Sequence, residues 1–405
     1  MACPTPIRSS AVPAELMVRA QRPRAVQLRR FGPLLLAAVL VAACGARTGA
    51  AEDECPASAV QTLRVAWTAA PRRLQVVFVV DVTGSMTPEI VAIIERADEV
   101  AIALHALAPE VLVDVAATGD GGGRAAGPRS ATVADTAALL SYTRALIEDG
   151  GDPAEGQLTA PYGYLSEDPD FYRFSFVRGG GLPPRCVPGA PGAPCLEPTT
   201  PRLFIFATDS PFHLGPGGSN PYRDDPQPPC SFEAVRDLLQ STRSRAIVAY
   251  GDTGGVVRAE VEALARVSGA VRADGTPIAI EGAGAAMVDG LLEAVRQWRD
   301  EVPFDLAVRA TVTGAAPGLV ERVRIVSIVP PPMGLVGDDR ASGVTPGAIV
   351  ELEVDIDPAQ ILRGRRATIA LELWDADRVV LDRVELEYAL PREPFVACSL
   401  DGGPG

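Results

Sequence analysis

Apolar runs and amphipathic segments alternate through the middle of the sequence. Residues 74–80 (LQVVFVV) form an almost continuous apolar run that ends at Asp81, a pattern typical of a central strand buried on both faces. Residues 87–89 (TPE) then supply a capping residue, a proline for the first helical position and an acid in the first turn. Because the apolar positions from 90 to 104 recur at helical spacing, the stretch predicts a strand followed by a helix.

The alternation continues as far as residue 298. Strands are expected at 111–117, 203–207 and 246–250, and helices at 132–147, 232–239, 256–267 and 287–298. Strand and helix in turn predict an α/β fold, a doubly wound and mostly parallel sheet with helices on both faces, over residues 72–300. A Gly/Pro-rich insertion at 166–200 interrupts this domain, and the sequence does not indicate its role.

After Pro303 the period of the pattern changes to two. Between residues 348 and 357 (AIVELEVDID) apolar and acidic side chains alternate, as in a strand with one buried face. Similar patterns at 306–312, 320–329, 368–374 and 379–388 predict a C-terminal antiparallel β-sandwich over residues 303–398. A further strand at 63–67, within the segment 60–71, could join this sandwich, and the α/β domain would then be an insertion in it.

The first 43 residues have the composition of an export signal. Six Arg and one Glu precede or flank a short apolar run at 31–43, which is followed at once by Cys44. The run is too short to span a bilayer. Residues 41–44 (VAAC) resemble the lipobox of a bacterial lipoprotein signal, with translation beginning at Met1 or Met17. The resemblance implies a lipid on Cys44, a tether at 44–59 and an outer-membrane lipoprotein of the cell envelope. The alternative is a plain secretory signal with an incidental cysteine.

Charge and cysteine content agree with an exported protein. The net charge of −14 becomes more negative without the basic leader, and an acidic surface repels nucleic acid. Five cysteines beyond Cys3 and Cys44 are candidates for disulfides: Cys55, Cys186, Cys195, Cys230 and Cys398. Cys186 could pair with Cys195, or one of these two with Cys230 instead, and Cys55 could pair with Cys398, which leaves at least one thiol over. No spacing indicates a zinc site.

The loop after the first buried strand carries oxygen ligands at alternate positions. Asp81, Thr83 and Ser85 lie in the sequence DVTGS, in which Gly84 permits a tight turn. In an open α/β sheet ligands bind at the carboxyl ends of the strands, where Asp81 falls. Carboxylate and hydroxyl oxygens suit a hard cation, Mg²⁺ first, with Mn²⁺ or Ca²⁺ as alternatives. The incomplete coordination would leave the ion open to an acidic group.

Two further acidic segments could complete this site. Asp209 follows the apolar strand expected at 203–207, and Asp152 and Glu155 lie on a glycine-rich loop that opens a helix. With these three segments the chain resembles a von Willebrand factor type A domain with a metal-ion-dependent adhesion site, of the integrin-β-like branch. The resemblance covers residues 72–300. The alternative is that these residues serve only as turn residues and helix caps.

The resemblance implies a role for each matching residue. Thr83 and Ser85 would be direct ligands, Glu155 would coordinate, and Asp81 and Asp209 would bind directly or through water. Asp152, His213 and Glu89 are candidates for supporting these ligands. A second adjacent ion is not expected, because residues 88–89 (PE) stand where that branch has paired acids.

These features lead to three hypotheses about function. The first is metal-dependent adhesion to an acidic group of a protein partner, without a small-molecule cofactor. The second is a periplasmic scaffold in which the metal only stabilises the fold. The third is an aspartyl-phosphate hydrolase with Asp81 as nucleophile. This third hypothesis is the weakest, because the chain has no lysine to hold a phosphoryl group and Thr83 replaces the usual second acid.

Overall fold

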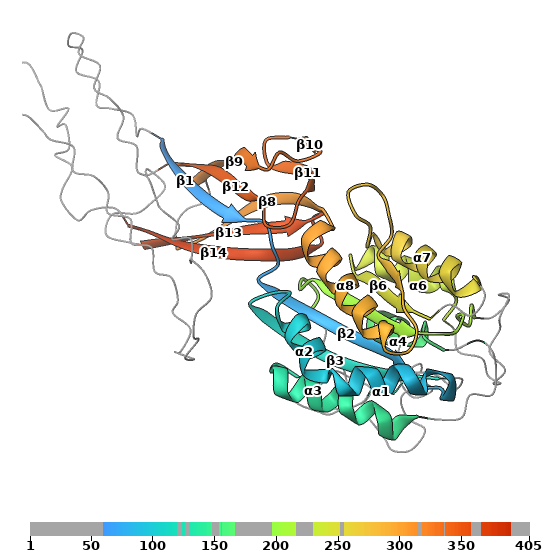
Figure 1. Ribbon diagram of the computed structural model, residues 1–405. Coiled ribbons are helices and arrows are strands. Elements are labelled where there is room, and N and C mark those ends of the chain that lie inside the picture. Colours follow the sequence, from blue (N-terminus) through green and yellow to red (C-terminus); the bar gives the residue numbers. More distant parts are fainter. Residues whose placement is uncertain are drawn as a thin grey trace, which may run out of the picture.

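The computed structural model describes two bodies, an α/β domain and a β-sandwich (Figure 1). The described residues are 60–119, 124–125, 130–147, 154, 156–166, 197–215, 230–251, 255–314, 318–335, 337–357 and 366–389. Residues 1–59, with the signal and Cys44, lie outside this set, as do Cys55, Cys186, Cys195 and Cys398. The expectations that depend on those residues stay predictions.

The α/β domain is built on a six-stranded sheet. Its strands are β2 (Arg73–Asp81), β3 (Glu110–Thr118), β4 (Arg124–Ala125), β5 (Arg202–Thr208), β6 (Arg245–Tyr250) and β7 (Ala279–Glu281). Their order is β4-β3-β2-β5-β6-β7, and all neighbours are parallel except β3 and β4. The chain builds one half of the sheet outward from β2 and then returns to β5 on its other side. The order therefore reverses between β2 and β5, where doubly wound sheets bind ligands.

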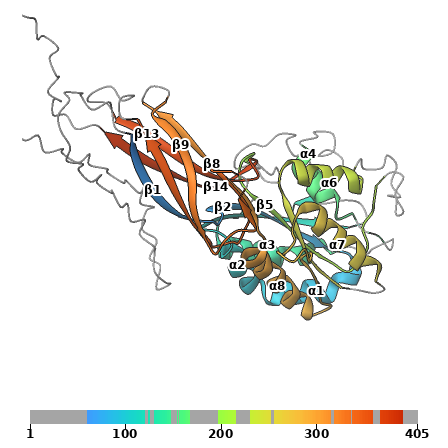
Figure 2. The ribbon, with the colours of Figure 1, turned by 90° about the horizontal axis from the view of Figure 1, so that it is seen from above.

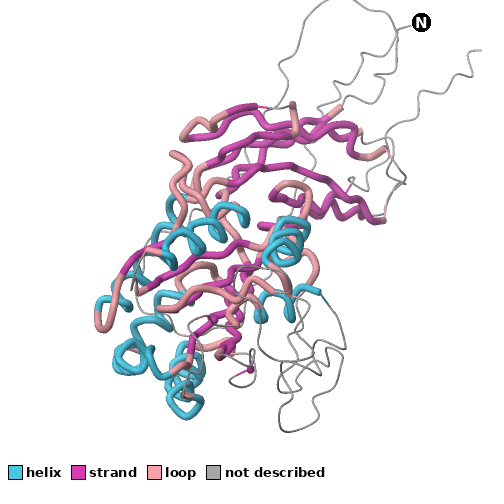
Figure 3. The backbone as a smooth tube through the Cα atoms, turned by 90° about the vertical axis from the view of Figure 1, so that its right-hand side faces the viewer, coloured by secondary structure: helices cyan, strands magenta, loops and turns pink. Residues whose placement is uncertain are grey.

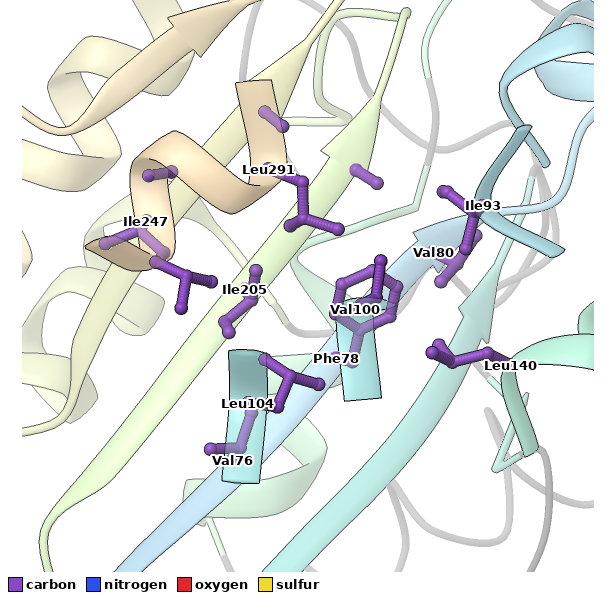
Figure 4. Packing of buried hydrophobic residues seen from close by; sticks show 14 of the residues in the cluster. Val76, Phe78, Val80, Ile93, Val100, Leu104, Leu140, Ile205, Ile247 and Leu291 are labelled. Atoms are coloured by element: carbon purple, nitrogen blue, oxygen red, sulfur yellow. The ribbon is translucent and has the colours of Figure 1, made fainter. Parts of the chain in front are cut away.

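Helices cover both faces of this sheet. One face packs against α1 (Thr87–Glu95), α2 (Ala97–His105), α3 (Val133–Tyr142) and α8 (Ala286–Glu301), and the other against α4 (Thr159–Ser166), α6 (Phe232–Ser241) and α7 (Val256–Ser268). In β2 the side chains of Val76, Phe78 and Val80 enter the first core and those of Val77 and Val79 enter the second. Figure 4 shows the first core, with Phe78 between the helices and the strands. The apolar run of β2 thus lies buried on both faces, and the predicted fold class is confirmed.

The helix after β2 differs from the sequence expectation in two ways. Thr87 does not cap it: a 3₁₀ turn, η1 (Gly84–Met86), runs into α1, so Met86 occupies the cap position and Thr87 Oγ1 donates to Gly84 O at 2.8 Å. The helical periodicity also continues through a break at Arg96, which has φ −115° and ψ 23°. Arg96 bonds to Glu99 and Asp289, so the break comes with a contact between α2 and α8.

The sandwich consists of a three-stranded and a five-stranded sheet. Figures 2 and 3 show its strands on one side of the α/β domain. The three-stranded sheet has the order β1-β12-β9 and the five-stranded sheet β10-β11-β8-β13-β14. The bounds are β1 (Gln61–Thr68), β8 (Phe304–Thr313), β9 (Val320–Val329), β10 (Gly334–Leu335), β11 (Arg340–Val344), β12 (Ile349–Ile356), β13 (Arg366–Asp375) and β14 (Val379–Ala389). The alternation in β12 has the expected effect, since Val350, Leu352, Val354 and Ile356 are fully buried between the sheets.

Strand β1 belongs to the sandwich although it precedes the α/β domain in sequence. It pairs with β12 over eight residues, from Gln61 opposite Ile356 to Thr68 opposite Ile349. The chain therefore leaves the sandwich after β1, forms the α/β domain, and re-enters the sandwich at β8.

A group of charged side chains joins the two bodies. Arg245, at the start of β6, and Asp375, at the end of β13, are both buried, with Arg245 Nη2 3.2 Å from Asp375 Oδ2. Arg243 Nε lies 3.3 Å from the same oxygen, and Arg243 Nη2 lies 2.8 Å from Asp305 Oδ2. The backbone N–H of Asp305 donates to Asp375 Oδ1 at 2.9 Å. Asp375 therefore receives both charged and neutral donors from elements on either side of the contact.

Among the described residues, no helix is long and apolar enough to cross a membrane. Cys230 is the one cysteine within the described part of the chain, where it is fully buried and no disulfide is present. Its suggested partners lie outside that part, so its pairing is still a prediction.

Candidate metal centre

The DVTGS loop folds its polar side chains onto one another at the end of β2. Asp81 is fully buried, and its Oδ1 accepts hydrogen bonds from the backbone N–H of Thr83 at 3.0 Å and from Thr83 Oγ1 at 2.7 Å. Thr83 Oγ1 lies 3.2 Å from Ser85 Oγ. The loop leaves β2 in the position that the pattern predicted, and its short side chains reach back to the strand end because Gly84 and Ser85 turn directly into η1.

Asp209 closes the row of oxygens from the neighbouring strand. It follows the last residue of β5, and its Oδ1 accepts from Ser85 Oγ at 3.1 Å and from Ser210 Oγ at 3.0 Å. Gly251 lies beside it, since a Cβ at that glycine would be 3.2 Å from the Cβ of Asp209. Thr83 donates its hydroxyl proton to Asp81 and Ser85 donates its own to Asp209, so the contact between the two hydroxyls is not a further hydrogen bond in this arrangement. Asp81, Thr83, Ser85 and Asp209 thus form one row of neighbouring oxygens across the point where the strand order reverses.

Two residues that the sequence reasoning did not single out hold the other side of Asp81. Thr208 Oγ1 donates to Asp81 Oδ2 at 3.0 Å, and Gln157 Nε2 donates to the same oxygen at 3.1 Å and to Thr208 Oγ1 at 2.8 Å. All three side chains are fully buried. Thr208 could have been recognised as the last residue of an apolar strand, whereas no local signal in the sequence brings Gln157 to Asp81.

Burial dominates the electrostatics of the centre. It raises the pKa of Asp81 from an ordinary value of 3.8 to about 6, against the hydrogen bonds from Thr83, which lower it. The negative charge of Asp209 raises the pKa further. A buried carboxylate faced by a second carboxylate is stabilised in its charged form by a cation.

The residues proposed to support the ligands lie at different places. Glu89 is buried, and its Oε1 accepts from the backbone N–H of Gly284 at 2.6 Å, so the described contacts tie it to the loop before α8. His213 is buried in the loop that follows Asp209. Asp152 and Glu155 lie outside the described residues, so the predicted coordination by Glu155 is untested.

The backbone of the loop after β5 is held by hydrogen bonds that do not involve the carboxylates of Asp81 and Asp209. The backbone N–H of Ser210 donates to Thr208 Oγ1 at 3.2 Å, and that of Phe212 donates to Glu260 Oε2 on α7 at 2.6 Å. Phe212 is fully buried in the second core of the sheet. Asp209 therefore projects from a loop whose backbone is anchored on both sides.

The donor set fits a small divalent cation. Two carboxylates and two hydroxyls supply hard oxygen ligands of the kind that Mg²⁺ prefers. Gln157 Oε1 is also buried without a hydrogen-bond partner among the described residues. Those residues contain no cluster of three or more His, Cys, Asp and Glu side chains that could hold a metal. A cation here would thus depend on the hydroxyls of Thr83 and Ser85 and on outside oxygens.

Comparisons with known proteins find likeness at the level of structure. No protein-family model matches the chain, and no curated protein matches it. A von Willebrand factor type A protein from Catenulispora acidiphila is similar with a TM-score of 0.36 and 14% identity, covering 81% of this chain and 69% of that one. The human COPII-coat protein Sec24c is similar with a TM-score of 0.38 and 10% identity, covering 80% of this chain and 43% of that one.

Structural similarity at these TM-scores does not indicate an activity for this protein. The class of the protein follows instead from its own strand order and site. It is a doubly wound α/β domain with a carboxylate–hydroxyl centre at the reversal of strand order, carried by an antiparallel β-sandwich.

Proposed function

We propose that this protein binds a divalent cation at Asp81, Thr83, Ser85 and Asp209, and through it an acidic group of a protein partner. The observation that carries the proposal is the row of oxygens from Asp81 to Asp209, with distances of 2.7, 3.2 and 3.1 Å between successive members. Asp81, Thr83 and Ser85 come from the loop after β2 and Asp209 follows β5, so the row joins segments 124 positions apart, which a turn or a helix cap within one segment does not require. A bound ion would bring the Lewis acidity that attracts a carboxylate.

The exposure of the row supports an outside ligand. Asp81 and Thr83 are buried, whereas Ser85 is exposed and Asp209 is partly exposed. One side of the centre is thus enclosed by protein and the other is open to solvent. A site that only stabilised the fold would be better served by ligands on all sides, so the open side favours the adhesion hypothesis over the scaffold hypothesis.

The cellular setting is part of the proposal. The leader at 1–43 and Cys44 support export and a lipid anchor in the cell envelope, with residues 44–59 as a tether to β1. The centre does not favour the aspartyl-phosphate hydrolase hypothesis, because Thr83 stands where such an enzyme has a second acid.

Calorimetric titration of the purified protein with Mg²⁺ and Mn²⁺ tests the proposal. We expect one saturable site that Ser85→Ala weakens by about tenfold or more, as expected when one of a few ligands is removed. Thr87→Ala is the matched control, since Thr87, the first residue of α1, bonds through its Oγ1 to Gly84 O and not to the centre. No binding by the wild type, or equal loss in both variants, contradicts the proposal.

The same preparations separate adhesion from scaffolding and from catalysis. The protein is immobilised and probed with carboxylate-bearing peptides in Mg²⁺ and in chelator. Adhesion predicts capture of acidic peptides that needs Mg²⁺ and Ser85, whereas a scaffold predicts a metal-dependent melting temperature without capture. Release of phosphate from a phosphate ester, lost in Asp81→Asn, would instead support a hydrolase.

A further inference from the structure

Gln157 has a buried side-chain amide whose nitrogen makes two hydrogen bonds, whereas its oxygen makes none with the described residues. It lies just before α4, in a turn where the backbone N–H of Gly156 donates to Gly119 O at 3.2 Å, next to the end of β3. Its amide nitrogen donates to Asp81 Oδ2 and to Thr208 Oγ1. Its amide oxygen is buried and has no partner among the described residues.

The orientation of this amide is set by chemistry. An ionised carboxylate can only accept hydrogen bonds, so the NH₂ group and not the oxygen must face Asp81. Both N–H donors are then used, one on Asp81 and one on Thr208. Turning the amide over would place its oxygen against the carboxylate oxygen, which is repulsive. Gln157 Oε1 is therefore left without a described partner because the nitrogen of the same amide must face Asp81.

A buried acceptor without a donor is unfavourable, and native proteins rarely keep one. The two described groups that bond to the amide both act as acceptors toward it: Asp81 is a carboxylate, and Thr208 Oγ1 already donates its own proton to Asp81. The described residues therefore supply no donor for Gln157 Oε1, and a molecule that enters the centre would supply one. Water held on a bound cation would be such a donor, because a cation turns the protons of its water outward.

We propose that Gln157 is a positioning residue of the metal centre, one that holds Asp81 through its nitrogen and receives ion-bound water through its oxygen. The inference rests on the proposed function. It assigns to Gln157 a task that the DVTGS loop cannot perform, because Thr83 approaches only the other carboxylate oxygen, Oδ1. Gln157 thereby keeps Asp81 from rotating away from the row of hydroxyls.

A contact of this kind is tested by Mn²⁺ affinity in matched variants. Gln157→Met has nearly the same length and volume but neither donor nor acceptor, and we expect its Kd for Mn²⁺ to rise by about tenfold to hundredfold. Thr159→Val is the control. Its hydroxyl is also fully buried and bonds to Gly156 O within the same turn, without contact to Asp81. An equal loss in both variants would overturn the inference, since the effect would then belong to the folding of the turn.

A second measurement reports on the exchange of water bound to Mn²⁺. The relaxation rate of solvent protons, taken per bound Mn²⁺, is expected to rise in Gln157→Met, because the water then lacks its acceptor and exchanges faster. It is expected to stay unchanged in Thr159→Val. An unchanged Kd together with an unchanged relaxation rate in Gln157→Met overturns the inference and leaves the proposed function intact. Absence of Mn²⁺ binding in the wild type overturns both.

A third measurement needs no substitution and covers the case in which Gln157→Met does not fold. In wild-type protein labelled with ¹⁵N on glutamine, one side-chain amide pair should show proximity to the methyl group of Thr208. We expect that pair to shift on addition of Mg²⁺ and to keep its contact with Thr208. If no glutamine amide shifts while calorimetry detects binding, the assignment to Gln157 is wrong.

Discussion

At the scale of single residues, Asp81 couples the candidate centre to pH. Its pKa is raised to about 6 by burial, so the metal-free folded protein holds a proton between about pH 4 and pH 6 that the unfolded chain has released. The stabilisation from this proton is complete below about pH 4 and is lost as the pH rises through about 6. At neutral pH the ionised group costs about 3 kcal/mol of unfolding free energy.

We therefore predict that Mg²⁺ stabilises the protein more at about pH 7.5 than at about pH 5, because protons compete with the cation for Asp81. Urea denaturation in Mg²⁺ and in chelator at the two pH values measures the difference. Asp81→Asn carries no titrating group and should remove most of it. An equal Mg²⁺ effect at both pH values would mean that Asp81 does not bind the ion.

Gly251 sets how closely β6 approaches Asp209. A Cβ there would lie 3.2 Å from the Cβ of Asp209, so Gly251→Ala should push the carboxylate aside by a few tenths of an ångström. We predict a rise in the Kd for Mn²⁺ of roughly threefold to tenfold, because ligand positions tolerate little displacement. Gly337→Ala is the control, since its Cβ would lie 3.5 Å from Asp339 Oδ1 in the sandwich. Unchanged affinity in Gly251→Ala would show that Asp209 does not contribute a ligand.

Sequence reasoning found the residues of the centre that a local pattern marks. Asp81, Thr83 and Ser85 follow a buried strand at alternate positions, and Asp209 follows another, so the parallel sheet brings them together. Gln157 could not be found in this way. It lies on a turn whose place against Asp81 is fixed by packing between segments 76 positions apart.

At the scale of elements, the turn between β13 and β14 carries strain. Ala376 has φ 48° and Asp377 has φ 59°, both in the left-handed region, and the backbone N–H of Arg378 donates to Asp375 O at 3.0 Å. Turns of this kind favour Asn or Gly at the first central position. Asp377 forms ion pairs with Arg309 and Arg340, and these contacts offset the strain at its backbone. The methyl group of Ala376 makes no such contact among those described.

We predict that Ala376→Asn raises the unfolding free energy by roughly 0.5–1 kcal/mol, because asparagine tolerates the left-handed conformation better than alanine. The measurement is the urea midpoint, with an unchanged dependence of free energy on urea concentration. A lower midpoint would show that the turn is not limited by backbone strain.

The elements themselves were predicted where periodicity is strong. Strand β2 was recognised from its apolar run and β12 from strict alternation, because burial imposes both patterns. The break at Arg96 was not recognised, since neither glycine nor proline marks it. The short edge strands β4, β7 and β10 were also not recognised, because two or three residues are too few to show a period.

At the scale of the whole molecule, Asp375 joins the α/β domain to the sandwich. Asparagine at this position would leave Arg245 buried without its charged partner. We predict that Asp375→Asn lowers the unfolding free energy by about 3–5 kcal/mol, and that the urea transition separates into two steps. Fluorescence and circular dichroism followed in parallel would detect the separation.

Asp305→Asn provides the matched comparison. Asp305 is 52% exposed and also pairs with Arg243, so its loss should cost about 1 kcal/mol or less. Similar costs in the two variants would mean that the buried pair of Arg245 and Asp375 does not hold the bodies together. The sequence did not reveal this contact, because an arginine at the start of an apolar strand resembles an ordinary strand terminus.

Strand β1 lies on the path by which a force on the N-terminal chain would reach the rest of the molecule. It leads through a short segment to β2, whose last residue is Asp81, so a pull on the chain ahead of β1 is transmitted along the backbone toward the candidate centre. Eight residues of β1 pair with β12 in antiparallel register, and a load along the strand stretches these pairs together instead of opening them one by one. If the tether and the centre are the two points of attachment, the tension between them falls on the part of the sandwich built to resist shear.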